Sequence, residues 1–371
     1  LFLYFAPILL AAQLRLSPDA EIRIVTCGPG QNELYSAFGH SAVRVYDPAK
    51  GFDILFNYGV FDFDQPNFYL NFTKGNLLYK LAVTDYQRFV NSYINEGRYV
   101  HEQILNFSPA EAQAYFTFLQ VNAMPQNTTY NYDYFYDNCA TRVRDGLLKA
   151  LGANALKFDS AHITEEYSIR DLCDMYLQQQ PWGDLGIDIC LGLPMDKKAT
   201  AAEYLFLPDY LELALSKASL TTATGYKPLV KETVITYPGS TQNEQPTFTP
   251  TLVFWLLLLV GIALSGWQWR AKKQLRWVDF SLFLILGLVG TLLAILWFFT
   301  DHSAAQFNFN LMWALPLHVL TAFLLLKKAK WKSTSAIILV LAFWHLVVAL
   351  LWFLLPQDLH PSLFPLNVLL L

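Results

Sequence analysis

The sequence predicts an α+β domain in the first 250 residues, followed by a C-terminal bundle of about five transmembrane helices. Composition is the first reason: the chain of 371 residues is 54% hydrophobic and 16% aromatic, too apolar for an ordinary soluble protein. Charge is the second reason, because residues 1–250 carry a net charge of −9 and residues 251–371 a net charge of +5. The acidic part has no basic stripe of the kind that phosphate backbones require, so we expect no nucleic-acid partner.

The chain begins with an apolar segment, residues 1–13 (LFLYFAPILLAAQ). Its apolar run and small residues are typical of a secretory signal peptide that lacks its Met and basic start. A buried N-terminal helix is the alternative interpretation. We expect residues 14–223 to form one folded domain, and residues 224–250, rich in Thr, Pro and polar residues, to form a linker or stalk.

The folded domain is expected to begin with strands. Alternating residues predict strands over 21–27, 40–47 and 52–59, and the turn PAKG predicts that the last two form a hairpin. Two helices are predicted further along the chain. The first covers 108–124 and opens with a capping box.

The second predicted helix follows a Tyr-rich loop. Its apolar residues recur at helical spacing, and the element is expected to stop at Gly152. Asn138 or Asp137 is expected to be its N-cap, because both side chains can accept the unpaired N–H groups of a first turn.

Residues 251–371 contain runs close to the ~20 apolar residues that cross a bilayer core. The expected spans are 251–269, 280–299, 309–326 and 336–355, with a partial fifth span at 363–371. The loops after spans one and three (270–276 and 327–332) hold four Lys or Arg each, whereas the loops after spans two and four hold none. Because basic loops stay in the cytoplasm, we expect everything before Thr251 to face the periplasm from the inner (cytoplasmic) membrane.

Cys139 is the candidate nucleophile. It follows the expected cap Asn138 and so sits in the first turn of a helix, where unpaired N–H groups and the helix dipole lower the pKa of a thiol. The apolar face of that helix is carried by Ala140, Val143 and Leu147, and Cys139 falls outside it. Free cysteines are usually structural, so a packed thiol is the alternative interpretation.

His40 is the candidate base. It begins a strand after a glycine, at an edge where its side chain can point into a groove. A base also needs a group that orients its other ring nitrogen. With the hairpin turn at PAKG, Asn57 and Tyr58 lie approximately opposite His40, and Asn57 can orient the imidazole, although a shift of one residue exchanges the two faces. A histidine that only belongs to the scaffold is the alternative.

Four segments resemble one family, in the same order along the chain. They are LYSAFGHSAVRVYD, FNYGVFDFDQPNFYLNFTKGNLLYKL, YDNCATRVRD, and the stretch from PWGDLGIDICLGLPMDKKAT to FLPDYL. Together they are similar to the Lnb family of Bacteroidota, in which a periplasmic domain precedes membrane helices. The order of His followed by Asn-Cys also resembles the circularly permuted papain-like (NlpC/P60-like) superfamily, which includes the lecithin:retinol acyltransferase-like thiol acyltransferases.

The resemblance implies a thiol acyltransferase that N-acylates lipoproteins. His40 would deprotonate Cys139, and the thiolate would attack an ester of a membrane phospholipid to give an acyl-thioester and a lysophospholipid. The α-amine of the diacylglyceryl-cysteine at a lipoprotein N-terminus would then take the acyl chain. The expected partners are therefore a phospholipid donor, a diacylated lipoprotein acceptor and the membrane.

Four residues near the predicted dyad are candidates for substrate binding: Arg142, Tyr58, Asn138 and Tyr136. Arg142 lies about one helical turn after the thiol and could hold a phosphate head group with both arms of its guanidinium. An ion pair with Asp145 or Asp137 is the alternative. Tyr136 belongs to the Tyr-rich loop, which could line a path for acyl chains or simply pack.

The other cysteines and the histidines have no comparable pattern. Cys27 competes for the role of nucleophile, but it ends a strand and has no helix dipole to lower its pKa. Cys173 and Cys190 are one plausible bridge among the three pairings open to four cysteines in an oxidising compartment. The seven histidines lack metal-ligand spacing, so we expect no metal and no cofactor. His318 and His345 are expected to pack between membrane helices.

Other functional classes stay open at this point. A membrane-anchored cell-wall amidase or cysteine peptidase, or a phospholipase-like hydrolase, would use the same dyad. A non-catalytic receptor or assembly factor would leave Cys139 replaceable. Fast labelling of Cys139 by a thiol reagent at neutral pH separates the enzymes from the non-catalytic class.

Overall fold

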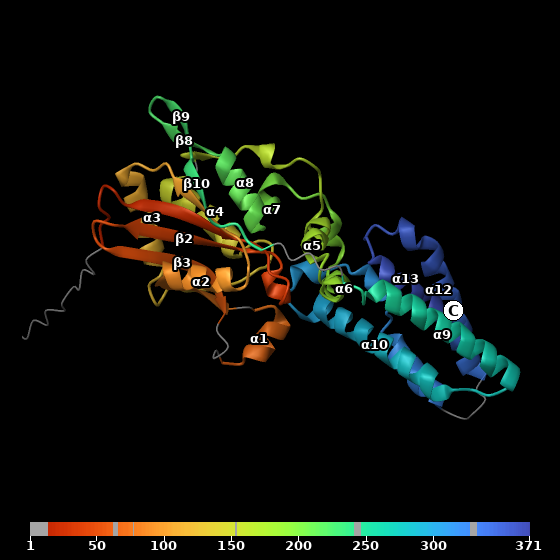
Figure 1. Cartoon of the computed structure of the whole chain (residues 1–371). Coiled ribbons are helices and arrows are strands. Elements are labelled where there is room, and N and C mark those ends of the chain that lie inside the picture. The colour runs from red at the N-terminus through yellow and green to blue at the C-terminus, as the bar shows by residue number, and fades with distance from the viewer. Residues whose placement is uncertain (1–13, 62–65, 77, 153, 241–245, 327–331) are drawn as a thin grey trace, which may run out of the picture.

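The structure is a computed structural model that describes residues 14–61, 66–76, 78–152, 154–240, 246–326 and 332–371. The predicted signal remnant, residues 1–13, lies outside the described residues. Figure 1 shows two regions, a sheet flanked by helices and a group of long helices at the other end of the molecule. A mixed α and β domain followed by membrane helices confirms the fold class that the sequence predicted.

A seven-stranded antiparallel sheet forms the centre of the first region, in the order β10-β5-β1-β2-β3-β4-β6. Its strands are Glu21–Cys27 (β1), His40–Asp47 (β2), Phe52–Phe61 (β3), Leu78–Asp85 (β4), Val100–Leu105 (β5), Thr129–Asn131 (β6) and Val230–Tyr237 (β10). The predicted hairpin is confirmed, because β2 pairs with β3 with Val43 opposite Phe56. A smaller sheet contains Leu156–Lys157 (β7), Ser219–Thr222 (β8) and Gly225–Pro228 (β9).

Helices cover both faces of the large sheet. Those of the first region are Phe68–Lys74 (α1), Tyr86–Asn95 (α2), Pro109–Asn122 (α3), Cys139–Leu151 (α4), Ile169–Leu177 (α5), Pro181–Cys190 (α6), Ala201–Tyr204 (α7) and Pro208–Lys217 (α8). Val43 and Phe56 face α3 and α4, whereas Ala42 and Leu55 face α2. Successive strand residues point to opposite faces, so these neighbours belong to two separate cores.

The predicted starts of α3 and α4 are confirmed by their caps. The Ser108 side chain accepts the N–H of Glu111, and the Glu111 carboxylate accepts the N–H of Ser108. Asn138 caps α4 in the same reciprocal way, with Thr141. Gly152 follows the end of α4 with a φ of 93°, a conformation that glycine adopts without the strain of a side chain.

The predicted stalk at 224–250 is wrong for its first half. Both β9 and β10 lie within it, and β10 extends the edge of the large sheet by pairing with β5, with Thr233 opposite Gln103. VKETVITY is rich in β-branched residues, which favour strands, and most of its side chains are exposed, as suits an edge strand. The predicted domain end at residue 223 therefore moves to at least Tyr237.

Four helical segments are long and apolar enough to cross a membrane: Pro250–Ala271 (α9), Arg276–Phe299 (α10), Phe309–Leu326 and Ser335–Leu354. They match the first four predicted spans. The third is interrupted before α11 (Leu317–Leu326) at Pro316, which cannot donate a helical hydrogen bond. The fourth contains α12 (Lys332–Leu351). At the predicted partial fifth span, the structure has the short helix α13 (Phe364–Leu369).

Small and polar residues mediate contacts between the membrane helices. Gly287 and Gly290 let α10 approach the backbone that leads into α11, and a Cβ at Gly290 would lie 1.8 Å from Ala314 O. His318 and His345 stack with ring centroids 5.1 Å apart, which confirms that they pack between helices. Close backbone approach of this kind stabilises helix association in lipid. Apolar side chains contribute little to association there, because lipid tails are as apolar as the side chains themselves.

The two regions are docked on each other. Figure 1 shows α5 and α6 between the large sheet and the membrane helices. Asn308 Nδ2 donates to Ile189 O at 2.8 Å, and Gln357 Nε2 donates to Leu191 O at 2.9 Å, so loops between membrane helices hold the end of α6. At Gly192 a Cβ would lie 1.8 Å from a backbone oxygen of the facing loop. Contact this close fixes the sheet domain on the membrane region instead of leaving it on a flexible tether.

Substitution of Gly290 tests the helix packing. Gly290→Ala should destabilise the membrane region, because its methyl group overlaps Ala314 O, and overpacking of this kind costs about 1–3 kcal/mol. Gly266→Ala in α9 is the matched control, since a Cβ there meets nothing within 4 Å. Thermal unfolding of the protein in detergent measures both. Equal midpoints for the two variants would contradict the close packing of α10.

Candidate functional site

Cys139 opens α4 where this helix meets β2 and β3. Asn138 Oδ1 accepts hydrogen bonds from Ala140 N at 2.9 Å and Thr141 N at 3.0 Å. In return, the Thr141 hydroxyl oxygen accepts the N–H of Asn138 at 2.8 Å. These reciprocal bonds make the first turn of α4 rigid, so the thiol is held at a defined position.

His40, the first residue of β2, reaches the thiol from the sheet. The imidazole and the Cys139 thiol are hydrogen-bonded to each other. His40 Nε2 donates to Asn57 Oδ1 at 2.7 Å. A neutral imidazole with its proton on Nε2 has its lone pair on Nδ1, the nitrogen that can take a proton from the thiol. The structure therefore brings together the three residues that the sequence predicted as a catalytic group.

The surroundings of Cys139 favour its thiolate. Burial raises the pKa of the thiol, but the charge of His40, the hydrogen bond to its ring and the backbone N–H groups of Ser41 and Ala140 outweigh burial and leave this pKa below its usual value. Burial lowers the pKa of His40, but the Cys139 thiolate and the hydrogen bonds to Cys139 and Asn57 raise it above its usual value. Each partner thus stabilises the charged form of the other, and the pair favours thiolate and imidazolium.

The other three cysteines lack such surroundings. All four cysteines are unpaired, so the bridge considered between Cys173 and Cys190 is absent. Burial raises the pKa of Cys27, Cys173 and Cys190. Cys27, the second candidate nucleophile, lies opposite His40 in the β1–β2 ladder, but its side chain is 0% exposed. Cys139 is therefore the one cysteine of the four whose thiolate is favoured.

Gly59 in β3 keeps the space beside the pair open. Its φ is +85°, and a Cβ there would lie 3.7 Å from Cys139 Cβ and 4.0 Å from His40 Cε1. Tyr132 lines the same space, with its ring 3.5 Å from that Cβ position, and stacks on Tyr79 at a centroid distance of 4.2 Å. Neither Gly59 nor Tyr132 was predicted from the sequence: a bulge in β3 brings Gly59 to the thiol, whereas Tyr132 reaches it from the segment after β6.

Two of the predicted substrate-binding residues are committed to the fold, and their predicted roles are wrong. Asn138 donates both amide hydrogens, to Tyr134 O and Phe206 O at 2.8 Å each, while its oxygen accepts the two N–H groups of α4. It has no hydrogen-bonding capacity left for a ligand. Tyr58 is 2% exposed and lies in the core under α3 and α4, because it points to the face opposite to Asn57.

The other two candidates, Arg142 and Tyr136, lie nearer the surface. Both arms of the Arg142 guanidinium pair with Asp137, with Nη2 2.6 Å from Oδ2, and its Cζ lies 3.8 Å from the centre of the Tyr130 ring. This is the ion pair that the sequence left open as an alternative. Tyr136 is 42% exposed. Substrate contacts of Arg142 and Tyr136 stay predictions.

Aromatic residues of α2 complete the surroundings of His40. The Tyr93 ring stacks with the imidazole at a centroid distance of 6.3 Å and an interplanar angle of 14°, and Phe89 lies 6.1 Å away. The sequence analysis missed both. Their i, i+4 spacing signals a shared helix face, but it does not say that this face covers His40.

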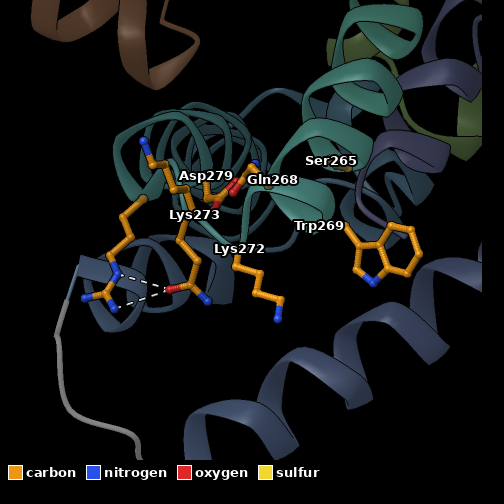
Figure 2. Close-up of a pocket in the computed structure, with 8 residues that line it drawn as sticks. Ser265, Gln268, Trp269, Lys272, Lys273 and Asp279 are labelled. Atoms are coloured by element: carbon orange, nitrogen blue, oxygen red, sulfur yellow. Dashed lines mark hydrogen bonds between the residues drawn. The ribbon is translucent and has the colours of Figure 1, made fainter.

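A cavity lies far along the chain from the thiol, at the ends of α9 and α10. It has a volume of about 770 Å³, and Figure 2 shows Lys272, Lys273 and Trp269 around it. These residues belong to the loop that the charge pattern assigns to the cytoplasm, and none of them contacts the catalytic group. Among the residues that the structure describes, no cluster of three or more His, Cys, Asp or Glu could hold a metal ion.

Two family models match the chain. Residues 15–174 match the Lnb N-terminal periplasmic domain, and residues 241–371 match the Lnb transmembrane domain. The matches cover the sheet region and the helical region separately, and they agree with a multi-pass membrane protein whose N-terminal domain faces the periplasm. No curated protein and no solved structure matches the chain.

Thiol reactivity tests the electrostatics of the pair. Iodoacetamide should label Cys139 at neutral pH faster than the other cysteines, and labelling should persist below the usual thiol pKa of about 8.5, because the Cys139 pKa is lowered. His40→Ala should slow the labelling of Cys139, since loss of the imidazole charge and of its hydrogen bond to the thiol raises the Cys139 pKa. Peptide mass spectrometry across a pH series measures the rates. Equally slow labelling of all four cysteines in the wild type would contradict an activated thiol.

Substitution of Gly59 tests whether the space beside the thiol matters. Gly59→Ala should slow the labelling of Cys139, because the new methyl group enters the space beside the thiol and the imidazole. Gly51→Ala is the matched control: its φ of +67° gives comparable backbone strain, but a Cβ there meets nothing within 4 Å. Both variants should lose about 1 kcal/mol of stability. Equal labelling rates in the two variants would show that the gap is not used.

Proposed function

This chain belongs to the Lnb family, and from that membership and the Cys139–His40 pair we propose that it is a thiol acyltransferase that N-acylates lipoproteins. The acyl chain comes from a membrane phospholipid, forms a thioester with Cys139, and ends on the α-amine of a diacylglyceryl-cysteine. One observation carries the proposal: a thiol with a lowered pKa opens a helix and is hydrogen-bonded to an imidazole. Cysteine acyl-transfer chemistry needs such a nucleophile and base.

In the first half of the reaction, the Cys139 thiolate attacks the carbonyl carbon of a phospholipid ester. The C–S bond forms while negative charge moves to the carbonyl oxygen, and the backbone N–H group of Ser41 is a nearby donor that can stabilise it. The ester C–O bond then breaks, and the His40 imidazolium gives its proton to the leaving alkoxide. The products are an acyl-thioester and a lysophospholipid.

In the second half, neutral His40 accepts a proton from the α-amine of the lipoprotein as the nitrogen attacks the thioester. The C–S bond breaks, an amide forms, and the thiolate and imidazolium are restored. Asn57 keeps Nε2 occupied in both halves, so that Nδ1 faces the reacting atoms each time. No group other than the two substrates and these side chains is needed to balance the transfer.

The docking of the sheet domain supports a substrate in the membrane. Hydrogen bonds join it to the loops between membrane helices at α6, and Asp301 N donates to Lys74 O after α1 at 2.9 Å. Both substrates of the proposed reaction lie in the outer leaflet of the inner membrane. A domain held against that surface meets them directly, whereas an amidase or peptidase of the cell wall would gain nothing from being held there.

A reporter lipoprotein tests the transfer. In cells unable to N-acylate lipoproteins, the wild-type protein should add a third acyl chain to the N-terminal peptide of the reporter, and Cys139→Ala should add none. His40→Ala should slow transfer by roughly 10²–10⁴-fold, the usual contribution of a general base. Intact mass of the peptide measures the product. Cys190→Ala is the control, because that thiol lies outside the catalytic group and should be dispensable.

The other outcomes identify the rival functions. A diacylated reporter together with accumulating lysophospholipid and free fatty acid would indicate a phospholipase-like hydrolase. A diacylated reporter with cleaved muropeptides would indicate a cell-wall amidase or peptidase. Full transfer by Cys139→Ala would overturn the thioester mechanism.

A further inference from the structure

A second cavity lies on the α2 side of the sheet, where Tyr93 separates it from the Cys139–His40 pair. It has a volume of about 320 Å³ and is lined by the loop after β1, the end of α2 and Ser240. Tyr93, which stacks on the His40 ring, forms part of its wall. The volume lies at the lower end of the range for small-molecule sites, so it fits a lipid head group and is too small for a whole phospholipid.

Arg98 is the one positively charged residue among the described residues that line this cavity. Its side chain is 8% exposed: Nε donates to Gly28 O at 2.7 Å, and Nη1 lies 3.1 Å from a Glu96 oxygen. Its Nη2 is buried and has no hydrogen-bond acceptor within the described part of the chain. A buried donor without a partner is costly, and phosphate oxygens match the guanidinium fork, so a phosphate is the ligand that Arg98 suits best.

The rest of the lining offers acceptors. Ser36, Ser92 and Ser240 each donate their hydroxyl hydrogen to a backbone carbonyl, so their oxygens have only lone pairs left for a ligand. Glu33 and Glu96 add two carboxylates. With one cation and two anions, this lining is complementary to a ligand that carries both a phosphate and an ammonium group.

The cavity lies at the end of the sheet domain that is docked on the membrane region. Gln180 at the start of α6 approaches Glu33 O, at 3.5 Å, and Trp182 in α6 donates to Phe248 O just before α9. Tyr35 on the rim is 79% exposed. A head group at the membrane surface therefore has a short path to the cavity.

The cavity is also close to the reacting atoms. The Tyr93 ring centre lies 4.5 Å from Arg98 Cζ and 6.3 Å from the centre of the His40 ring. In a phospholipid, the ester carbonyls are only a few bonds away from the phosphate. Arg98 and His40 thus pack near the same tyrosine ring, and a phosphate at Arg98 would lie one side chain away from the Cys139–His40 pair.

We infer that this cavity binds the head group of a zwitterionic phospholipid of the phosphoethanolamine class, with the phosphate at Arg98 and the ammonium among the serine oxygens and Glu33. The inference rests on the proposed function for the step that follows binding, acyl transfer to Cys139. An anionic phosphoglycerol head group would lie beside the same two carboxylates, Glu33 and Glu96, but it has no ammonium group to pair with them. It is therefore the poorer donor.

Two assays with the full-length protein test this inference separately. In vesicles, the donors have identical acyl chains and either a phosphoethanolamine or a phosphoglycerol head group. The rate of Cys139 acylation, measured by intact mass, is compared between the two donors. In detergent, saturation-transfer NMR compares binding of the soluble fragments glycerophosphoethanolamine and glycerophosphoglycerol and of inorganic phosphate. The wild type should prefer the ethanolamine form in both assays and bind inorganic phosphate more weakly.

Two variants separate the parts of the site. Arg98→Lys should weaken binding of both fragments by about tenfold, because it keeps the charge and loses the fork. Glu33→Gln should leave phosphoglycerol unaffected and reduce the preference for ethanolamine by about threefold, the effect of one exposed ion pair. Glu232→Gln, an exposed carboxylate on the edge strand β10, is the matched control and should change neither. Labelling of Cys139 by iodoacetamide checks that each variant is folded.

Each outcome is decisive for one of the two proposals. Equal use of the two head groups by the wild type, or wild-type behaviour of both Arg98→Lys and Glu33→Gln, would overturn the head-group site while acyl transfer stands. Failure of every phospholipid to acylate Cys139, with ethanolamine-selective binding intact, would overturn the proposed function and leave the binding site. Equal binding of inorganic phosphate and glycerophosphoethanolamine would reduce the cavity to a phosphate site and overturn the zwitterionic assignment.

Discussion

The hydrogen-bonded pair of Cys139 and His40 depends on the place where one helix begins. The Asn138 cap decides that α4 starts at Cys139, and thereby puts the thiol beside the N–H group of Ala140 and against the first residue of β2. Burial alone would raise the pKa of this thiol, as it does for Cys27. The imidazolium and the backbone donors reverse that effect, so a cysteine that is almost buried can still act as an anion.

Several features of the domain orient the imidazole of this pair and leave space beside the thiol. Asn57 holds the imidazole from β3, while the bulge in β3 and Gly59 keep side chains out of the space beside the ring and the thiol. On the other side of the ring, Tyr93 separates the pair from a cavity that contains the buried guanidinium of Arg98. The Cys139–His40 pair thus lies between two spaces of different chemistry, one lined by tyrosines and one that contains charged groups.

The contact with the membrane region holds the Cys139–His40 site in a defined position relative to the membrane helices. Loops between the membrane helices donate hydrogen bonds to the end of α6, and behind them Arg170 pairs with Asp188 at 2.7 Å and Asp196 at 2.8 Å, with little exposure of any of these side chains. Breaking one partner of such a buried network is costly, so the end of α6 that these loops hold is a firmly fixed part of the first region. The bilayer substrates of the proposed reaction would then meet the site from the membrane side.

The sequence by itself determined the local elements and the chemistry of single residues: the capped start of α4, the hairpin of β2 and β3, the four long apolar spans, and the choice of Cys139 and His40. These depend on periodicity, capping and residue type, which act within a few positions along the chain. Only the tertiary structure shows that Tyr58 lies in the core and that all hydrogen-bonding groups of the Asn138 side chain are already used. It also shows that β10 pairs at the sheet edge where a stalk was predicted, and that Tyr93 and Arg98 lie near His40. Those facts depend on which strand face meets which helix and on pairing between residues more than a hundred positions apart, and no local pattern in the sequence carries that information.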